Sequence, residues 1–211
     1  MPREPYSSAE NTLIFFARGE EAQHLRGADD ELGALIDQLE VVSVDIDGDG
    51  FRALARAIVD QQISIHAARA IWLRLEDYCS IVTAETIAAA DEDEMRACGL
   101  SRSKIAALKD LAAHIHDGRI DFDHLAQLDD EEIITVLTQV RGIGRWTAQM
   151  HLIFALGRHD VFAVNDGALR RAVEKLKGLP PNSPPALIEA IAEDWSPYRT
   201  VAALYLWKSL S

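Results

Sequence analysis

The chain has 211 residues, of which 48% are hydrophobic, and a formal net charge of −13 at pH 7. This composition argues against a disordered chain, and the length suits one domain or two small lobes. No apolar run approaches the roughly 20 residues of a membrane span, and residues 1–5 lack the apolar core of a secretory signal. We therefore expect a cytoplasmic protein with no membrane partner.

The elements expected along the chain are almost all helices. Apolar residues recur at spacings of three and four over residues 53–60, 66–76, 104–116 and 130–140. Turn-forming residues separate these segments at 47–50, 98–101, 116–118 and 178–181. Residues 183–185 suit the start of another helix, and 198–210 is apolar almost all round, as a buried helix would be. Because no strand-like alternation persists, we expect an all-α fold with low strand content.

The sequence offers little to hold a metal or a cofactor. Cys79 and Cys98 are too few for a cysteine-ligated zinc or iron–sulfur site unless other residues join, and they fit a reduced cytosolic protein. Residues 45–50 resemble a calcium loop but lack the glutamate at its twelfth position, so we interpret them as a solvated loop. We expect no catalytic metal and no iron–sulfur cluster.

The charge is unevenly distributed. Residues 1–50 hold twelve acids and three bases, whereas residues 141–171 hold five arginines and two aspartates. Nucleic-acid-binding proteins usually show a basic footprint, so the overall charge predicts weak non-specific binding to DNA. Exposed charges beyond roughly 8 Å are largely screened at physiological salt, so the local basic patch matters more than the total.

The run Gly142-Ile143-Gly144 lies between two apolar, helix-like segments, residues 133–140 and 146–156. Glycine permits a tight hairpin and a close approach of backbone to a ligand. The amides of Gly142, Gly144 and Arg145 would open the second helix, where N–H groups and the helix dipole attract an anion such as a phosphate. This pattern is typical of a helix-hairpin-helix that holds DNA by its backbone, although a simple turn between packed helices would look the same.

Asp166 follows Gly144 by 22 residues and precedes a helical stretch. An aspartate in this place is a good helix N-cap, which contributes about 1 kcal/mol. It is also a candidate catalytic carboxylate.

Two further segments place polar residues at helix junctions. Residues 61–64, Gln-Gln-Ile-Ser, interrupt an apolar helical pattern with paired glutamines, which are costly in a core and favour a polar groove. Residues 98–104 place Leu100 beside hydroxyls and two cations, which suits a minor-groove wedge with phosphate contacts. Either segment could equally be an ordinary helix junction.

Taken together, these segments resemble the helix-hairpin-helix DNA glycosylase superfamily, specifically its 3-methyladenine DNA glycosylase II branch in a compact form. The resemblance spans roughly residues 30–210, and its motifs occur in family order at residues 61–68, 99–104, 140–148, 160–171 and 195–207. It implies two helical lobes with a DNA- and base-binding cleft between them. The first lobe would be approximately residues 50–135, and the second 1–49 with 136–211, in one compact unit of 1–211.

The same resemblance implies roles for individual residues. Asp166 matches the catalytic aspartate, Gln62 the residue that fills the gap left by an extruded base, and Leu100 the wedge on the opposite strand. The remaining DNA-binding candidates are Gly142, Gly144, Arg145, Thr147, Gln61, Ser64, Ser101 and Lys104. A structural monovalent cation at the hairpin is compatible with the family.

Trp146 stands where strand-cleaving relatives carry a lysine that forms a Schiff base, so we expect no lyase activity. Its ring would instead stack on an electron-poor base in the base pocket, the alternative being core packing. Met150 stands where some relatives place a pocket tyrosine, and Gly167 where relatives usually have a larger apolar residue. These departures predict a more permissive pocket and a looser loop.

The resemblance thus implies a monomeric, monofunctional glycosylase that hydrolyses alkylated bases from double-stranded DNA in base excision repair. Two alternatives stay open. One is a non-catalytic helix-hairpin-helix DNA binder, and the other is a glycosylase for oxidised, mismatched or deaminated bases. A purely structural acidic helical protein is a further, weaker alternative.

Overall fold

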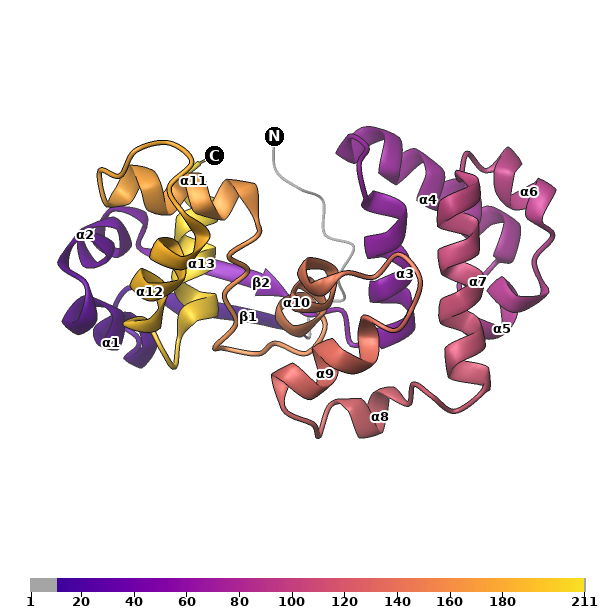
Figure 1. Cartoon of the computed structure of the whole chain (residues 1–211), viewed down its shortest axis with the longest axis horizontal. Coiled ribbons are helices and arrows are strands. Elements are labelled where there is room, and N and C mark those ends of the chain that lie inside the picture. The colour runs from indigo at the N-terminus through magenta and orange to yellow at the C-terminus, as the bar shows by residue number, and fades with distance from the viewer. Residues whose placement is uncertain (1–10, 211) are drawn as a thin grey trace. The chain divides into compact units, whose positions relative to one another are not determined.

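The computed structural model describes residues 11–210 (Figure 1). The expectation that the N-terminal residues contain no secretory signal lies outside these residues. The chain divides into two compact units. We call them the central unit, Asp47–His151, and the terminal unit, which comprises the residues up to Ile46 together with those from Leu152.

The terminal unit combines helices with a small sheet. Its elements are β1 (Thr12–Phe16), α1 (Glu20–Ala28), α2 (Asp30–Leu39), β2 (Val41–Asp45), α11 (Gly167–Leu176), α12 (Pro185–Glu193) and α13 (Arg199–Lys208). Helix α13, drawn in yellow in Figure 1, contacts α1, α2, α11 and β2. Residues 200–206 of α13 are all buried, which confirms the prediction of a buried final helix.

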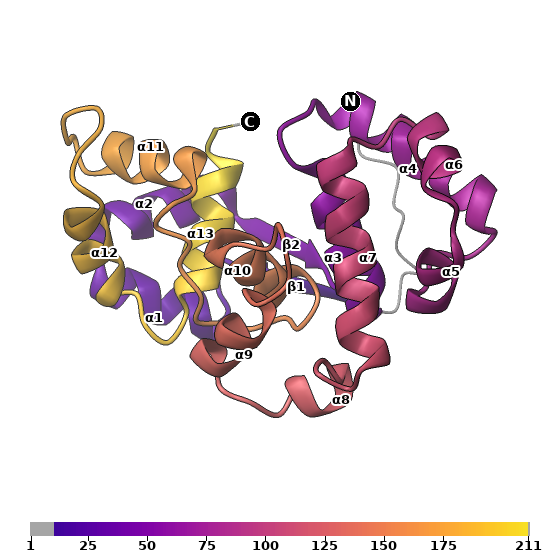
Figure 2. The same cartoon turned by 45° about the vertical axis from the view of Figure 1, so that its right-hand side comes forward.

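The central unit is helical throughout its described residues. Its elements are α3 (Gly50–Asp60), α4 (Ile65–Cys79), α5 (Ala84–Ala89), α6 (Glu92–Ala97), α7 (Arg102–His116), α8 (Phe122–Leu125) and α9 (Asp130–Leu137). Helix α7 is the centre of the packing, because it contacts α3, α5 and α6 (Figure 2). Its residues Ile105, Leu108 and Leu111 are buried against these neighbours. Helix α10 (Arg145–Phe154) begins in the central unit and ends in the terminal unit.

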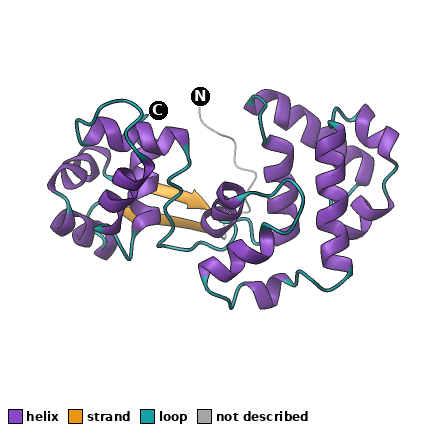
Figure 3. Cartoon of the chain, in the orientation of Figure 1, coloured by secondary structure: helices purple, strands orange, loops and turns teal. Residues whose placement is uncertain are grey.

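The predicted mostly helical fold is confirmed, with one addition (Figure 3). Strands β1 and β2 pair antiparallel, with Phe15 opposite Val42 and both side chains buried. The two strands have only five residues each, and β1 is an apolar run without polar alternation. Periodicity over a longer window therefore did not identify them. Among residues 11–210, no helix has the length and apolar character needed to cross a membrane.

The division of the chain differs from the expected lobe boundary near residue 135. The central unit continues to His151, so it includes the hairpin. The hairpin belongs to the central unit because two side chains of this unit bind it. Gln61 donates to the carbonyl of Gly142, and Asp110 accepts from the amide of Arg141.

Candidate functional site

The predicted hairpin joins α9 to α10 in the central unit. Helix α9 ends at Leu137, and α10 begins at Arg145. Gly142 has a φ of 79°, in the left-handed region, and a Cβ placed on it would lie 3.1 Å from Cβ of Ala107. Both observations favour glycine at this position. Ile143 is buried between the two exposed glycines, Gly142 and Gly144, so the turn presents its backbone outward.

Two side chains from other elements support the hairpin. Gln61 Nε2 donates to the carbonyl of Gly142 at 3.0 Å and to Thr147 Oγ1 at 3.3 Å. From α7, Asp110 Oδ2 accepts from the amide of Arg141 at 2.7 Å. Hydrogen bonds from two other elements restrict the backbone of the hairpin. The amides that open α10 therefore start from a defined turn, and a helix N-terminus attracts anions.

Several predicted DNA contacts meet around one open pocket of about 490 Å³ in the central unit. The pocket is lined by Gln61, Gln62, Ile63, Ser101, Ser103, Lys104, Ala107 and Gly142. These residues come from the α3–α4 loop, from the start of α7 and from the hairpin. The structure thus brings together three segments that are far apart in the sequence.

Polar residues in and beside the pocket also stabilise helix ends. Ser101, in the pocket, caps α7, and Ser64, in the α3–α4 loop, caps α4, each by accepting an amide hydrogen bond. Lys104 Nζ donates to the carbonyl of Val59 at 2.7 Å, near the C-terminus of α3, and burial lowers the pKa of its ammonium group. Thr147 is buried, so its hydroxyl supports Gln61 and does not face solvent.

The tip of the α3–α4 loop carries two exposed side chains. Gln62 is exposed and has a φ of 58°. Such a left-handed conformation costs a non-glycine residue roughly 1–2 kcal/mol. Ile63 is 37% exposed and was not identified from the sequence, although an apolar residue among polar ones was its signal. This loop holds its side chains out toward solvent.

Leu100 corrects one expectation. The sequence suggested an exposed wedge, but only 4% of this residue is exposed. Gly99, with a φ of 103°, turns the chain so that Leu100 enters the packed interior of the central unit. In this arrangement Leu100 does not form an exposed wedge. Ile63, on the pocket, is an exposed apolar side chain in the same unit.

The predicted base-pocket residues lie on α10. Trp146 is 39% exposed, which argues against the alternative of core packing, and Met150 is half-buried. Arg145 is exposed at the start of the helix and forms an ion pair with Glu131 of α9. The hydrogen bonds from Arg145 lower the pKa of the Glu131 carboxyl group. Any phosphate that used this guanidinium would therefore share it with a carboxylate.

Asp166 lies in the terminal unit at the N-terminus of α11. Its Oδ1 accepts from the amide of Leu169 at 2.7 Å, so the residue is an N-cap. The same oxygen accepts from Trp207 Nε1 at 3.1 Å. The carboxylate of Asp166 therefore caps α11 and also accepts a bond from outside that helix. Trp207 was not identified as a site residue from the sequence, since only the tertiary fold brings it to Asp166. The neighbouring Gly167 is exposed.

The described residues offer no arrangement of three or more His, Cys, Asp or Glu side chains that could hold a metal ion. In residues 45–50, which resemble a calcium loop in sequence, Asp49 caps α3 and Asp47 accepts from the amide of Asp49. Cys79 and Cys98 are both free thiols.

Comparison with known proteins adds a family context to this geometry. Residues 55–197 match the model described as "HhH-GPD superfamily base excision DNA repair protein". The chain is 39% identical over 163 residues to DNA-3-methyladenine glycosylase 1 of Schizosaccharomyces pombe, an alignment that covers 75% of this chain and 72% of that protein.

Two solved structures are similar over nearly the whole chain. One is a DNA-3-methyladenine glycosidase from Bacillus halodurans, with a TM-score of 0.87, 33% identity, and coverage of 93% of this chain and 92% of that one. The other is a 3-methyladenine DNA glycosylase from S. pombe in complex with abasic DNA, with a TM-score of 0.79, 34% identity, and coverage of 90% and 96%.

The contacts of Gln61 generate a first prediction. Replacing Gln61 by Leu removes the bonds to Gly142 and Thr147, and a net hydrogen bond contributes about 0.5–1.5 kcal/mol. We expect chemical denaturation to show a loss of about 1–2 kcal/mol in the free energy of unfolding. The matched control is Gln127→Leu, whose amide donates to Asp123 within one short segment, and we expect it to cost under about 0.5 kcal/mol. Equal losses in both variants would contradict the supporting role.

His151, on α10, generates a second prediction. Both of its ring nitrogens are buried without a hydrogen-bond partner among the described residues, and burial lowers its pKa from 6.5 to about 4. Between these values the unfolded chain binds the proton and the folded chain does not, so stability falls as the pH falls from 6.5 to 4 and is unaffected above 6.5. The loss is about 2–4 kcal/mol.

The measurement is the free energy of unfolding against pH for the wild type, for His151→Leu and for the exposed-site control His66→Leu. We expect His151→Leu to flatten the curve between pH 6.5 and 4, and His66→Leu to follow the wild type. A curve for His151→Leu as steep as that of the wild type would contradict the assignment.

Proposed function

The chain belongs to the HhH-GPD superfamily of base excision DNA repair proteins, and we propose that it is a monofunctional DNA glycosylase that excises alkylated bases. Bases of the 3-methyladenine and 7-methylguanine type are its proposed substrates. The single observation that carries the proposal is Asp166, a carboxylate held by two donors in a family whose similar members are named for this reaction.

Binding to DNA would begin at the central unit. The exposed hairpin backbone at Gly142 and Gly144, which leads into the N-terminus of α10, suits a phosphate. The adjoining pocket adds the ammonium of Lys104 and the exposed side chain of Gln62. A base within the duplex is inaccessible, so it must be flipped, at a cost of a few kcal/mol that is smaller for a damaged pair. The exposed loop carrying Gln62 is suited to fill the gap that flipping leaves.

The chemistry requires little acid catalysis from the protein. An alkylated purine is already cationic, so when its bond to C1′ of the sugar breaks, the bonding electrons neutralise the base as it leaves. The sugar becomes an oxocarbenium ion, to which water adds at C1′ before losing a proton to solvent. One carboxylate can then suffice where glycoside hydrolysis usually needs two.

Asp166 would stabilise the sugar cation and help to position the water. Two opposite charges about 4 Å apart interact by up to roughly 4 kcal/mol at an effective dielectric constant of 20. That energy corresponds to about a thousandfold in rate. Loss of the charge of Asp166 could therefore reduce the rate of base release by up to about a thousandfold.

Trp146 supports the absence of strand cleavage. At this position a lysine would supply the amine for a Schiff base with the sugar, and an indole has none. Its partly exposed ring can instead stack on a cationic base, a contact worth roughly 0.5–2 kcal/mol. We propose that the enzyme acts as a cytoplasmic monomer on double-stranded DNA, without a cofactor. A monovalent cation at the hairpin stays a prediction, and the proposed reaction does not require it.

Asp166→Asn tests the assignment. We expect the variant to release alkylated bases at least 100-fold more slowly than the wild type in single-turnover assays on DNA with one 7-methylguanine. Its affinity for DNA containing an abasic-site analogue should change by less than about threefold, because Asn retains the size and the cap of Asp. The matched control Asp194→Asn alters an exposed carboxylate of the same unit and should leave both quantities unchanged.

The alternatives give different outcomes. Base release by Asp166→Asn at the wild-type rate would refute the catalytic assignment, and binding without base release by the wild type would favour a non-catalytic DNA binder. Release of oxidised or deaminated bases in preference to alkylated ones would favour the other class of glycosylase. No binding to abasic-analogue DNA at low salt would indicate a purely structural protein.

A further inference from the structure

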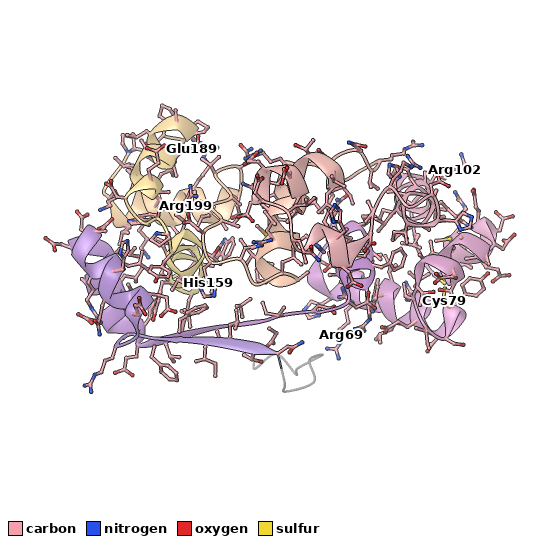
Figure 4. The ribbon with its side chains drawn as sticks, turned by 90° about the horizontal axis from the view of Figure 1, so that it is seen from below. Arg69, Cys79, Arg102, His159, Glu189 and Arg199 are labelled. Atoms are coloured by element: carbon pink, nitrogen blue, oxygen red, sulfur yellow. The ribbon has the colours of Figure 1, made fainter. Side chains whose placement is uncertain are left out.

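Residues 195–207 form a motif of the chain that the proposed function uses only through the bond from Trp207 to Asp166. Helix α13 begins within this motif at Arg199, which is labelled in Figure 4. Asp160 Oδ1 accepts from Arg199 Nε at 2.8 Å, and its Oδ2 accepts from Arg199 Nη2 at 2.9 Å and from Ser196 Oγ at 2.8 Å. These bonds to Arg199 and Ser196 outweigh the effect of burial and lower the pKa of the Asp160 carboxyl group. The segment that leads to Asp166 is thereby fixed to the start of α13.

The next residue of α13 adds three bonds to the same segment. Thr200 is buried, its amide donates to the carbonyl of His159 at 2.9 Å, and its hydroxyl donates to the carbonyl of Arg158 at 2.7 Å. That hydroxyl also accepts from the amide of Val161 at 2.9 Å. The backbone of residues 158–161 is therefore held along its length by the first turn of α13.

The far end of α13 contacts Asp166 itself. Trp207 Nε1 donates to Asp166 Oδ1 at 3.1 Å, and the amide of Leu169 donates to the same oxygen at 2.7 Å. Phe154 stacks on Trp207, with ring centroids 6.1 Å apart and 29° between the planes. Stacking on Phe154 therefore restricts the tilt of the Trp207 ring while its N–H donates to the carboxylate of Asp166.

We propose that Trp207 is a positioning residue for Asp166, an inference that rests on the proposed function. The N-cap bond from Leu169 reaches Asp166 Oδ1 from within α11, and the indole N–H of Trp207 reaches the same oxygen from another helix. Two donors from different elements restrict the rotation of the carboxylate more than either donor does alone. A shift of about 1 Å in a catalytic group can cost about 100-fold in rate, so the orientation matters as much as the charge.

A simpler role is open to Trp207, namely packing at the end of α13. The terminal unit provides a matched case that separates the two roles. Trp195 Nε1 donates at 2.8 Å to Asp29, which caps α2 by accepting from Leu32. Trp195 thus also donates its indole N–H to a capping aspartate, although to Oδ2 while Leu32 bonds to Oδ1, and this carboxylate has no proposed part in the reaction.

The test compares Trp207→Phe with Trp195→Phe in single-turnover release of 7-methylguanine. We expect Trp207→Phe to slow release about 10- to 100-fold. Its affinity for abasic-analogue DNA should change less than about threefold, and it should remain folded at the assay temperature by thermal unfolding. We expect Trp195→Phe to lower the unfolding temperature and to leave the rate of the folded enzyme within about threefold. Equal rates for Trp207→Phe and the wild type would overturn the proposal.

A second variant covers the case in which Trp207→Phe does not fold. Incorporation of benzothienylalanine at position 207 keeps the shape and the stacking of the indole but replaces N–H by sulfur. We expect it to reproduce the loss in rate, and retention of the wild-type rate by this folded variant would overturn the proposal.

Combination with Asp166→Asn separates this inference from the proposed function. If Trp207 acts through Asp166, adding Trp207→Phe to Asp166→Asn should change the residual rate by less than about twofold, whereas an independent packing role would give the full loss in both backgrounds. The full loss in both would overturn the positioning role. Wild-type release by Asp166→Asn alone would instead refute the catalytic assignment of Asp166, on which this inference rests.

Discussion

A carboxylate that stabilises a short-lived cation must be held in one orientation before the cation forms, because reorganisation during the reaction would raise the barrier. For Asp166, the proposed catalytic carboxylate of the terminal unit, such a restraint comes from two hydrogen bonds, because its Oδ1 accepts from both the Leu169 amide and the Trp207 indole. Helix α13 contacts both the segment that leads to Asp166 and Asp166 itself. Its first turn fixes residues 158–161, and its last turn provides Trp207. The burial of this helix gives the carboxylate a rigid reference.

The central unit applies the same strategy to backbone groups. The hairpin gains its shape from the left-handed conformation of Gly142, while Gln61 and Asp110 bind it from the α3–α4 loop and from α7. Lys104 adds a bond to the C-terminus of α3. Side chains that resemble DNA contacts thus also support the backbone that would contact DNA.

Local signals in the sequence were sufficient for the helices, the hairpin glycines and the cap at Asp166, because periodicity and capping depend on neighbouring residues. Tertiary contacts decided the rest. The burial of Leu100 depends on the turn at Gly99, and the indole of Trp207 reaches Asp166 across 41 residues of chain. The pairing of β1 with β2 brings together two short strands separated by two helices. None of these contacts has a local pattern.

The function proposed for this chain is the removal of alkylated bases from DNA by hydrolysis. Its most direct test is to incubate the wild-type protein with DNA treated with a methylating agent, and to identify the released bases and the state of the strand. We expect free 3-methyladenine and 7-methylguanine together with intact strands that carry abasic sites. Tight binding to the same DNA without free bases, or strand cleavage through an adduct trapped by borohydride, would contradict it.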